Sequence, residues 1–134
     1  MNLLLDTHVA LWAISKTSSL DADTKQSLVD PGNTVFYSIA SVWEIAIKHQ
    51  LYTGNMPISE EEFVSLCDES GFVQLPIQPA HIYAVKSLSR PRTAPKHNDP
   101  FDRLLIAQAK VEKMQLITSD GLLRDYGESC VVKI

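Results

Sequence analysis

The 134-residue chain has little of several features that mark common protein classes. Its two cysteines, Cys67 and Cys130, are not in a zinc-binding spacing, so we expect free thiols in a reducing cytoplasm rather than a disulfide scaffold. Neither a GxGxxG nor a P-loop motif occurs, which argues against a dinucleotide or nucleotide phosphate site. No apolar run approaches the roughly 20 residues of a membrane-spanning helix, and the N-terminal residues lack the basic region of a signal peptide. These absences favour a soluble, cytoplasmic protein.

The composition is that of an ordinary globular chain, with 45% hydrophobic and 21% charged residues. We expect a single domain over residues 1–134, because this length suffices to bury a core without disulfides or a structural metal. The net charge of −4, taken alone, argues against a strongly basic nucleic-acid-binding protein.

Apolar runs and amphipathic segments alternate along the chain. Strands are predicted at Asn2–Leu5, Thr34–Tyr37, Phe72–Leu75, Gln115–Thr118 and Cys130–Val132. Helices are predicted from Thr7 to about Ser15, from Asp21 to Pro31-Gly32, from Ile39 (capped by Ser38) to about Gln50, from the Ser59/Glu62 capping box to Gly71, from Pro79 to about Leu88, and from Asp99 to about Lys113. This order predicts an α/β sandwich with a central parallel β-sheet of about five strands flanked by helices.

Acidic residues recur where the strands end and the following helices begin. Asp6 follows the first strand, Asp120 follows the fourth, Glu44 lies within the helix after the second, and Asp99 and Asp102 open the long helix. The carboxyl ends of parallel strands share one edge, so we expect these acids to converge there. Like charges so placed need neutralisation, and carboxylates are preferred ligands of Mg²⁺ and Mn²⁺.

Each acid also has an ordinary structural interpretation. Helix capping alone would explain Asp6, Asp99 and Asp120, and an i,i+4 pair with Lys48 would explain Glu44. The Asp99-Pro100 pair suits the N-cap and first helical positions, so Asp99 is interpreted first as a cap. Asp102, at the third helical position, is the better metal ligand.

Polar residues flank the acids. Thr7, Thr118 and Ser119 can hydrogen-bond a carboxylate or a metal-bound water, or serve only as helix caps. His97 can contact a phosphate or orient Asp99, or be simply exposed to solvent. The two tryptophans, Trp12 and Trp43, lie on apolar helix faces, so we predict core packing rather than base stacking for both.

The charge balance changes if the five acids form a metal-neutralised cluster, since the net charge of −4 then becomes +1. The loop before the long helix is basic, and we expect RNA contacts at Arg90, Arg92, Lys96 and Arg103. The alternatives are a solubilising loop or contacts with a protein partner.

Four stretches of the chain resemble the PIN-domain ribonucleases, and within them the VapC-like toxins of type II toxin–antitoxin systems. They are LLLDTHVALW, SIASVWEIAIKHQLYTG, HNDPFDRLLIAQA and LITSD, and the third also matches an HxDPFDR subgroup. The resemblance implies a PIN-like three-layer sandwich whose acidic quartet is Asp6, Glu44, Asp102 and Asp120, with Asp99 as a supporting or second-metal ligand. It further implies a Mg²⁺- or Mn²⁺-dependent endoribonuclease that hydrolyses RNA through a metal-activated water, pairs as a homodimer and is inhibited by a cognate antitoxin.

The sequence leaves two alternatives to an active nuclease. A receiver-like phosphotransfer domain is also a small α/β fold, but the second and third predicted strands end without an aspartate. A PIN-fold binding protein without catalysis is disfavoured by the complete acidic quartet.

Surplus apolar residues on the first two helices and on the helix after Ser59 predict a protein interface there, with ordinary core packing as the alternative. They are Val9, Leu11, Trp12, Ile14, Leu20, Phe63, Val64, Leu66, Cys67 and Phe72.

Overall fold

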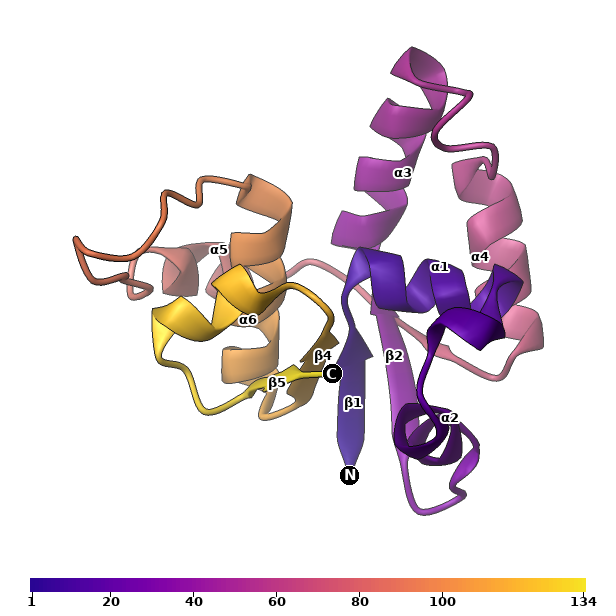
Figure 1. Ribbon diagram of the computed structural model, residues 1–134, viewed down its shortest axis with the longest axis horizontal. Helices are drawn as coiled ribbons and strands as arrows, with labels where there is room; N and C mark the ends of the chain where they lie inside the picture. Colours follow the sequence, from indigo (N-terminus) through magenta and orange to yellow (C-terminus); the bar gives the residue numbers. More distant parts are fainter.

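β1 (Asn2–Leu5) lies at the centre of a five-stranded parallel sheet in the computed structural model, which describes residues 1–134 (Figure 1). The strand order is β3-β2-β1-β4-β5, with β2 at Thr34–Ser38, β3 at Val73–Leu75, β4 at Gln115–Thr118 and β5 at Val131–Lys133. The predicted α/β sandwich is confirmed. A receiver-like domain has the strand order 2-1-3-4-5, so that alternative is wrong.

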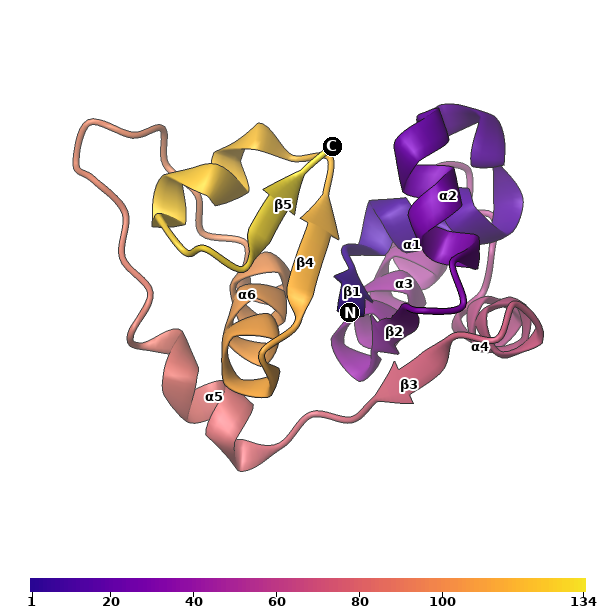
Figure 2. The same ribbon diagram turned by 90° about the horizontal axis from the view of Figure 1, so that it is seen from below.

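Helices cover both faces of the sheet (Figure 2). One face is covered by α1, α2 and α4, and the other by α5 and α6. The helices are α1 (Thr7–Ser15), α2 (Ala22–Val29), α3 (Ile39–Leu51), α4 (Glu60–Glu69), α5 (Pro79–Val85) and α6 (Pro100–Glu112), with 3₁₀ turns η1 (Thr17–Ser19) and η2 (Gly121–Tyr126). The predicted bounds differ from these by a few residues at most, mainly at the end of α5.

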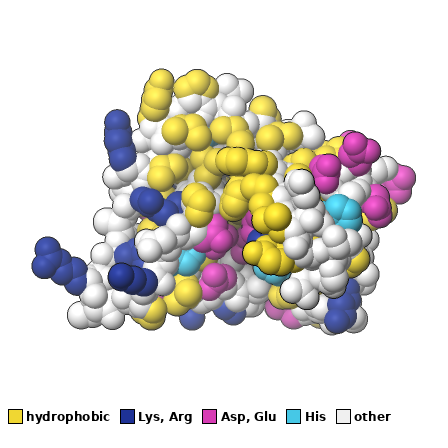
Figure 3. All heavy atoms as spheres, turned by 90° about the horizontal axis from the view of Figure 1, so that it is seen from above, with side chains coloured by type: hydrophobic (Ala, Val, Ile, Leu, Met, Phe, Trp, Pro, Cys, Tyr) yellow, Lys and Arg dark blue, Asp and Glu magenta, His cyan; other side chains and the backbone are white.

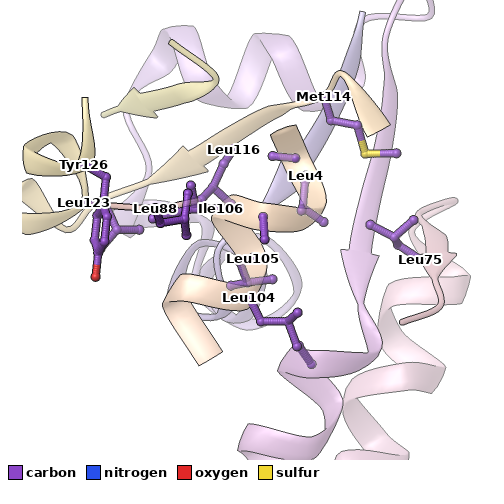
Figure 4. Packing of buried hydrophobic residues seen from close by; sticks show 13 residues of the cluster. Leu4, Leu75, Leu88, Leu104, Leu105, Ile106, Met114, Leu116, Leu123 and Tyr126 are labelled. Atoms are coloured by element: carbon purple, nitrogen blue, oxygen red, sulfur yellow. The ribbon is translucent and has the colours of Figure 1, made fainter. Parts of the chain in front are cut away.

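Side-chain alternation along β1 divides the core into two layers. Leu4 points into a cluster with α6 and η2, which includes Leu105, Leu116 and Leu123 (Figure 4). Leu3 and Leu5 point to the opposite face, toward α1 and α4. Burial on both faces explains why the strand sequences are short continuous runs of apolar residues.

The direction in which successive strands are added to the sheet reverses after β3, from one side of β1 to the other. Strands β2 and β3 extend to one side, whereas β4 and β5 lie on the other, so β1 and β4 form the topological switch point. In open α/β sheets, ligands bind beside the carboxyl ends of the strands at this point. The fold therefore predicts a site beyond the ends of β1 and β4.

A buried hydrogen bond ties α3 to α6. The Ser38 hydroxyl accepts from the Ala40 backbone N–H at 3.0 Å, which caps α3, and donates to Gln108 Oε1 of α6 at 2.5 Å. Ser38 and Gln108 are fully buried. This contact fixes the relative position of the two helices that carry Glu44 and Asp102.

Much of the apolar surplus predicted on α1 and α4 lies in the core or against it. Val9, Leu20, Phe63 and Cys67 are buried in the core, and the other residues of that set except Leu66 pack against the same cluster. Leu11, Trp12, Ile14 and Val64 remain partly exposed, so the interface predicted from these residues stays a prediction.

Apolar exposure is found elsewhere, and it includes a residue that we expected in the core. Trp43 on α3 is 58% exposed, so its predicted core position is wrong, and Ile82 and Tyr83 on α5 are exposed as well. Trp12, in contrast, packs partly buried against the core. Both cysteines are free thiols, as predicted. None of the helices combines the length and apolar character that crossing a membrane requires.

Candidate metal centre

The end of β1 holds Asp6 rigidly at the switch point. Its backbone N–H donates to the Ile117 carbonyl at 2.9 Å, which extends the pairing of β1 with β4 by one residue. One carboxylate oxygen accepts from the Thr7 N–H at 2.7 Å, and the other accepts from the Thr118 hydroxyl at 2.6 Å. Asp6 is only 4% exposed, and it caps α1 while its second oxygen is held by Thr118.

Glu44 enters the same region from the second turn of α3. It is 3% exposed, and its Oε1 accepts from the Thr7 hydroxyl at 2.7 Å. Its Oε2 pairs with Lys48 Nζ at 2.5 Å, so the i,i+4 pair exists, but it joins a buried carboxylate to a half-exposed ammonium. Thr7 and Thr118 thus hold the acids as expected, whereas the Ser119 side chain makes no hydrogen bond to them.

The N-terminus of α6 brings two more acids with different roles. Asp99 caps the helix, because its Oδ1 accepts from the backbone N–H groups of Phe101 and Asp102 at 2.9 and 3.2 Å. Asp102 stands at the third helical position, and its side chain is 15% exposed. The capping interpretation of Asp99 is confirmed.

His97 is fixed against Asp102 rather than exposed or aimed at Asp99. Its Nε2 lies 3.0 Å from Asp102 Oδ2, its Nδ1 lies 2.8 Å from the Tyr126 hydroxyl, and its side chain is 6% exposed. No sequence motif indicates a role for Tyr126, which reaches His97 from η2 across 29 positions of the chain. Together these two residues orient the Asp102 carboxylate.

Asp120 completes the cluster from the end of β4. Its Oδ1 accepts from the Leu122 N–H at 2.9 Å, which caps η2, and its own N–H donates to the Thr118 hydroxyl at 3.0 Å. Thr118 therefore bridges Asp6 and Asp120. Seen along the strands from their carboxyl ends, acidic side chains gather near the centre of the face, between hydrophobic and basic side chains (Figure 3).

The acidic cluster contains more negative charge than the nearby positive charge balances. Burial, followed by the charges of Asp6, Asp99, Glu44 and Asp120, raises the pKa of Asp102 to about 8. Burial also raises the pKa of Asp6, against the opposing hydrogen bonds from Thr118 and Thr7. The pKa of Lys48 is raised by Glu44, Asp99 and Asp102, although its partial burial acts to lower it. One ammonium does not balance the five carboxylates.

This donor set fits a hard divalent cation. Ligand atoms of His97, Asp102 and Asp120 all lie within 4.8 Å of one another. Asp6 and Glu44 are outside this group of three, but their buried carboxylates act on Asp102 electrostatically. Carboxylate oxygens are the ligands preferred by Mg²⁺ and Mn²⁺, and a cation would relieve the repulsion that raises the Asp102 pKa.

The basic loop between α5 and α6 divides into anchored and exposed side chains. Arg90, predicted as an RNA contact, is 11% exposed and donates to the Leu122 carbonyl at 2.6 Å and to the Pro95 carbonyl, while it stacks 4.9 Å from the Tyr126 ring centroid. Its guanidinium is therefore engaged within the protein. Arg92 and Lys96 are exposed, and Arg103 is half-buried.

Comparisons with known proteins agree with this architecture. The family model for the PIN domain matches residues 3–129. No curated protein gives a significant match.

Solved structures with the same fold cover nearly the whole chain. VapBC2 from Rickettsia felis, solved bound to a DNA fragment from its promoter, has a TM-score of 0.66 and 18% identity, and the match covers 100% of this chain and 98% of that one. A toxin–antitoxin complex from Klebsiella pneumoniae has a TM-score of 0.56 and 22% identity, covering 98% and 99%. A domain of a functionally unknown protein from Methanocaldococcus jannaschii has a TM-score of 0.60 and 15% identity, covering 99% and 90%. At these identities the likeness concerns the fold.

Proposed function

Because the chain belongs to the PIN domain family, we propose that it is a metal-dependent endoribonuclease and the toxin of a cytoplasmic toxin–antitoxin pair. The observation that carries the proposal is the buried acidic cluster at the switch point, in which four other carboxylates raise the pKa of Asp102. The HNDPFDR sequence at residues 97–103 supports placement in the HxDPFDR subgroup.

Asp6, Glu44, Asp102 and Asp120 would hold a Mg²⁺ or Mn²⁺ ion, with His97 and Asp99 as supporting residues. When bound, such an ion supplies an activated water and stabilises the oxygen that leaves phosphorus. The chain does the positioning. Thr7 and Thr118 fix the carboxylates of Glu44 and Asp6, and His97 fixes that of Asp102.

Exposed cations beside the cluster support an RNA substrate. Arg92 and Lys96 are exposed on the loop that leads to Asp99, and Arg103 follows Asp102 in α6. They can attract and align the phosphate backbone, which dominates the affinity of proteins for nucleic acids. Arg90 does not belong to this set, because its guanidinium contacts the Leu122 and Pro95 carbonyls and the Tyr126 ring.

A cognate antitoxin and a homodimer are part of the same proposal. Support for the antitoxin comes from the two toxin–antitoxin structures that share the fold, VapBC2 of Rickettsia felis and the complex from Klebsiella pneumoniae, whereas the homodimer rests on the sequence resemblance. Light scattering on the isolated protein, with and without the product of the neighbouring reading frame, tests both partners.

Digestion of total RNA by the purified protein tests the nuclease itself. We expect cleavage with Mg²⁺ or Mn²⁺, none with EDTA, and none from Asp6→Asn or Asp102→Asn. Asp99→Asn is the matched control and should be milder, because asparagine caps a helix nearly as well as aspartate. If the wild-type protein leaves RNA intact with either metal but still binds its antitoxin, the non-catalytic alternative is correct.

A further inference from the structure

An open pocket of about 580 Å³ lies where α3, α5 and α6 meet. Its walls are mainly apolar, with Trp43 from α3, Val85 from α5 and Phe101 from α6. Two cations, Lys86 and Arg103, line it as well. None of these side chains hydrogen-bonds the acids described above, although the Phe101 backbone N–H donates to Asp99.

The most unusual wall residue is Trp43. Large aromatic side chains are mostly buried, but Trp43 is 58% exposed. Its ring meets the Phe101 ring edge-on, with centroids 5.2 Å apart and an interplanar angle of 78°. Such a contact restricts the indole while leaving much of its surface open to a ligand.

The pocket adjoins the acidic cluster through two shared helices. Trp43 is followed in α3 by the buried Glu44, and Phe101 is followed in α6 by Asp102. Asp99, which caps α6, immediately precedes Pro100 of the pocket wall. A polymer bound at the acids would therefore have its neighbouring monomer unit beside this pocket.

The lining selects a ligand that is both aromatic and anionic. An exposed indole provides a stacking surface, whereas Lys86 and Arg103 provide positive charge next to it. A nucleotide combines a flat base with a phosphate, and proteins that bind single strands pair aromatic platforms with cations in this way. A purely apolar protein segment would form no ion pair with the two cations.

We propose that Trp43 forms a stacking platform for one nucleobase of the RNA next to the cleaved phosphodiester, with Lys86 and Arg103 attracting the adjoining phosphates. This inference rests on the proposed ribonuclease function and names how its substrate is held. Phe101 orients the indole from the side. The pocket would thus contact a base, whereas the other residues of the proposed site contact only the phosphate backbone of the RNA.

Binding of short oligonucleotides to the intact protein tests the platform. The probes are fluorescently labelled pentaadenylate and a pentameric ribose phosphate without bases, measured by anisotropy with Ca²⁺ in place of Mg²⁺, and electrophoresis checks that they stay intact. Trp43→Leu keeps an apolar side chain but removes the π surface. Base stacking contributes about 1–3 kcal/mol, so this variant should bind pentaadenylate roughly tenfold more weakly.

Two further variants separate stacking from other effects. Trp43→Phe retains an aromatic ring and should lose less affinity than Trp43→Leu. Tyr83→Ala removes an aromatic residue that is 66% exposed on α5 but lies outside the pocket lining, and it should bind both probes like the wild type. The probe without bases should bind wild type and Trp43→Leu equally.

The results that overturn the inference are distinct from those that overturn the nuclease. Unchanged pentaadenylate affinity in Trp43→Leu, or an equal loss for both probes, refutes stacking even if the wild type cleaves RNA. If Trp43→Leu instead changes the oligomeric state or antitoxin binding while RNA affinity holds, the pocket is a protein interface. Absence of RNA cleavage by the wild type refutes the proposed function, while base-dependent binding through Trp43 would still be measured.

Discussion

Replacement of Asp102 by asparagine should stabilise the metal-free protein, and the gain should grow with pH. Burial and four neighbouring carboxylates raise the pKa of Asp102 to about 8, from an ordinary value of 3.8. The folded state therefore retains a proton that the unfolded chain releases above about pH 4. Stability is lost as the pH rises from about 4 through about 8, because ionisation in the folded state works against burial and repulsion.

The size of the effect follows from the pKa difference. A difference of about four pKa units corresponds to an upper limit of about 5 kcal/mol near pH 8. The Asp102 side chain is 15% exposed, and neighbouring carboxylates share the repulsion, so we expect roughly half of that limit. Asparagine has a similar shape and can still accept a hydrogen bond from His97, so little of the gain should be offset.

Thermal unfolding in EDTA at pH 5 and pH 8 measures this difference. A gain of about 2–3 kcal/mol should raise the melting temperature of Asp102→Asn by roughly 6–10 °C at pH 8, and by clearly less at pH 5. Asp99→Asn, which changes a half-buried cap of the same helix, is the control. A lower melting temperature for Asp102→Asn at pH 8, or an equal gain at both pH values, would refute the reasoning.

Three other outcomes follow from the same site. Saturating Mg²⁺ or Mn²⁺ at 100 times its Kd should stabilise the wild type by about 2.7 kcal/mol and Asp102→Asn far less, and identical melting curves with and without metal would contradict a metal centre. Thr118→Val removes the 2.6 Å hydrogen bond to Asp6, so we expect a loss of about 1–3 kcal/mol in unfolding free energy and weaker Mg²⁺ binding by calorimetry; wild-type values would show that the bond is dispensable. Arg90→Lys loses the planar fork that ties the loop to the Leu122 carbonyl, so trypsin should cut residues 91–98 faster, and an unchanged cleavage rate would argue against anchoring.

The element order and the positions of the acids are consequences of local chemistry. Asp6, Asp99 and Asp120 each follow a strand or precede a helix, and each caps the helix that it was expected to cap. Short apolar runs fix the strands, and alternation with helices fixes a parallel sheet. These signals lie within a few residues of one another, so a single sequence contains them.

Contacts between distant segments were decided only by the tertiary structure. Nothing near His97 indicates that its ring lies between Asp102 and Tyr126, because Tyr126 is brought there by η2. Trp43 has apolar neighbours along α3, yet its exposure depends on where α5 and α6 lie. Arg90 resembles a free surface cation until the loop folds it onto Tyr126.

The local sequence pattern thus indicates which residues carry charge at the edge of the sheet, whereas the packing of the helices sets the burial of those charges and the distances between them. The pKa of Asp102 depends on burial and on Asp6, Glu44, Asp99 and Asp120, which come from three other segments as well as its own helix. Electrostatic and burial energies depend on distance and solvent access, and both are set only when the chain is folded.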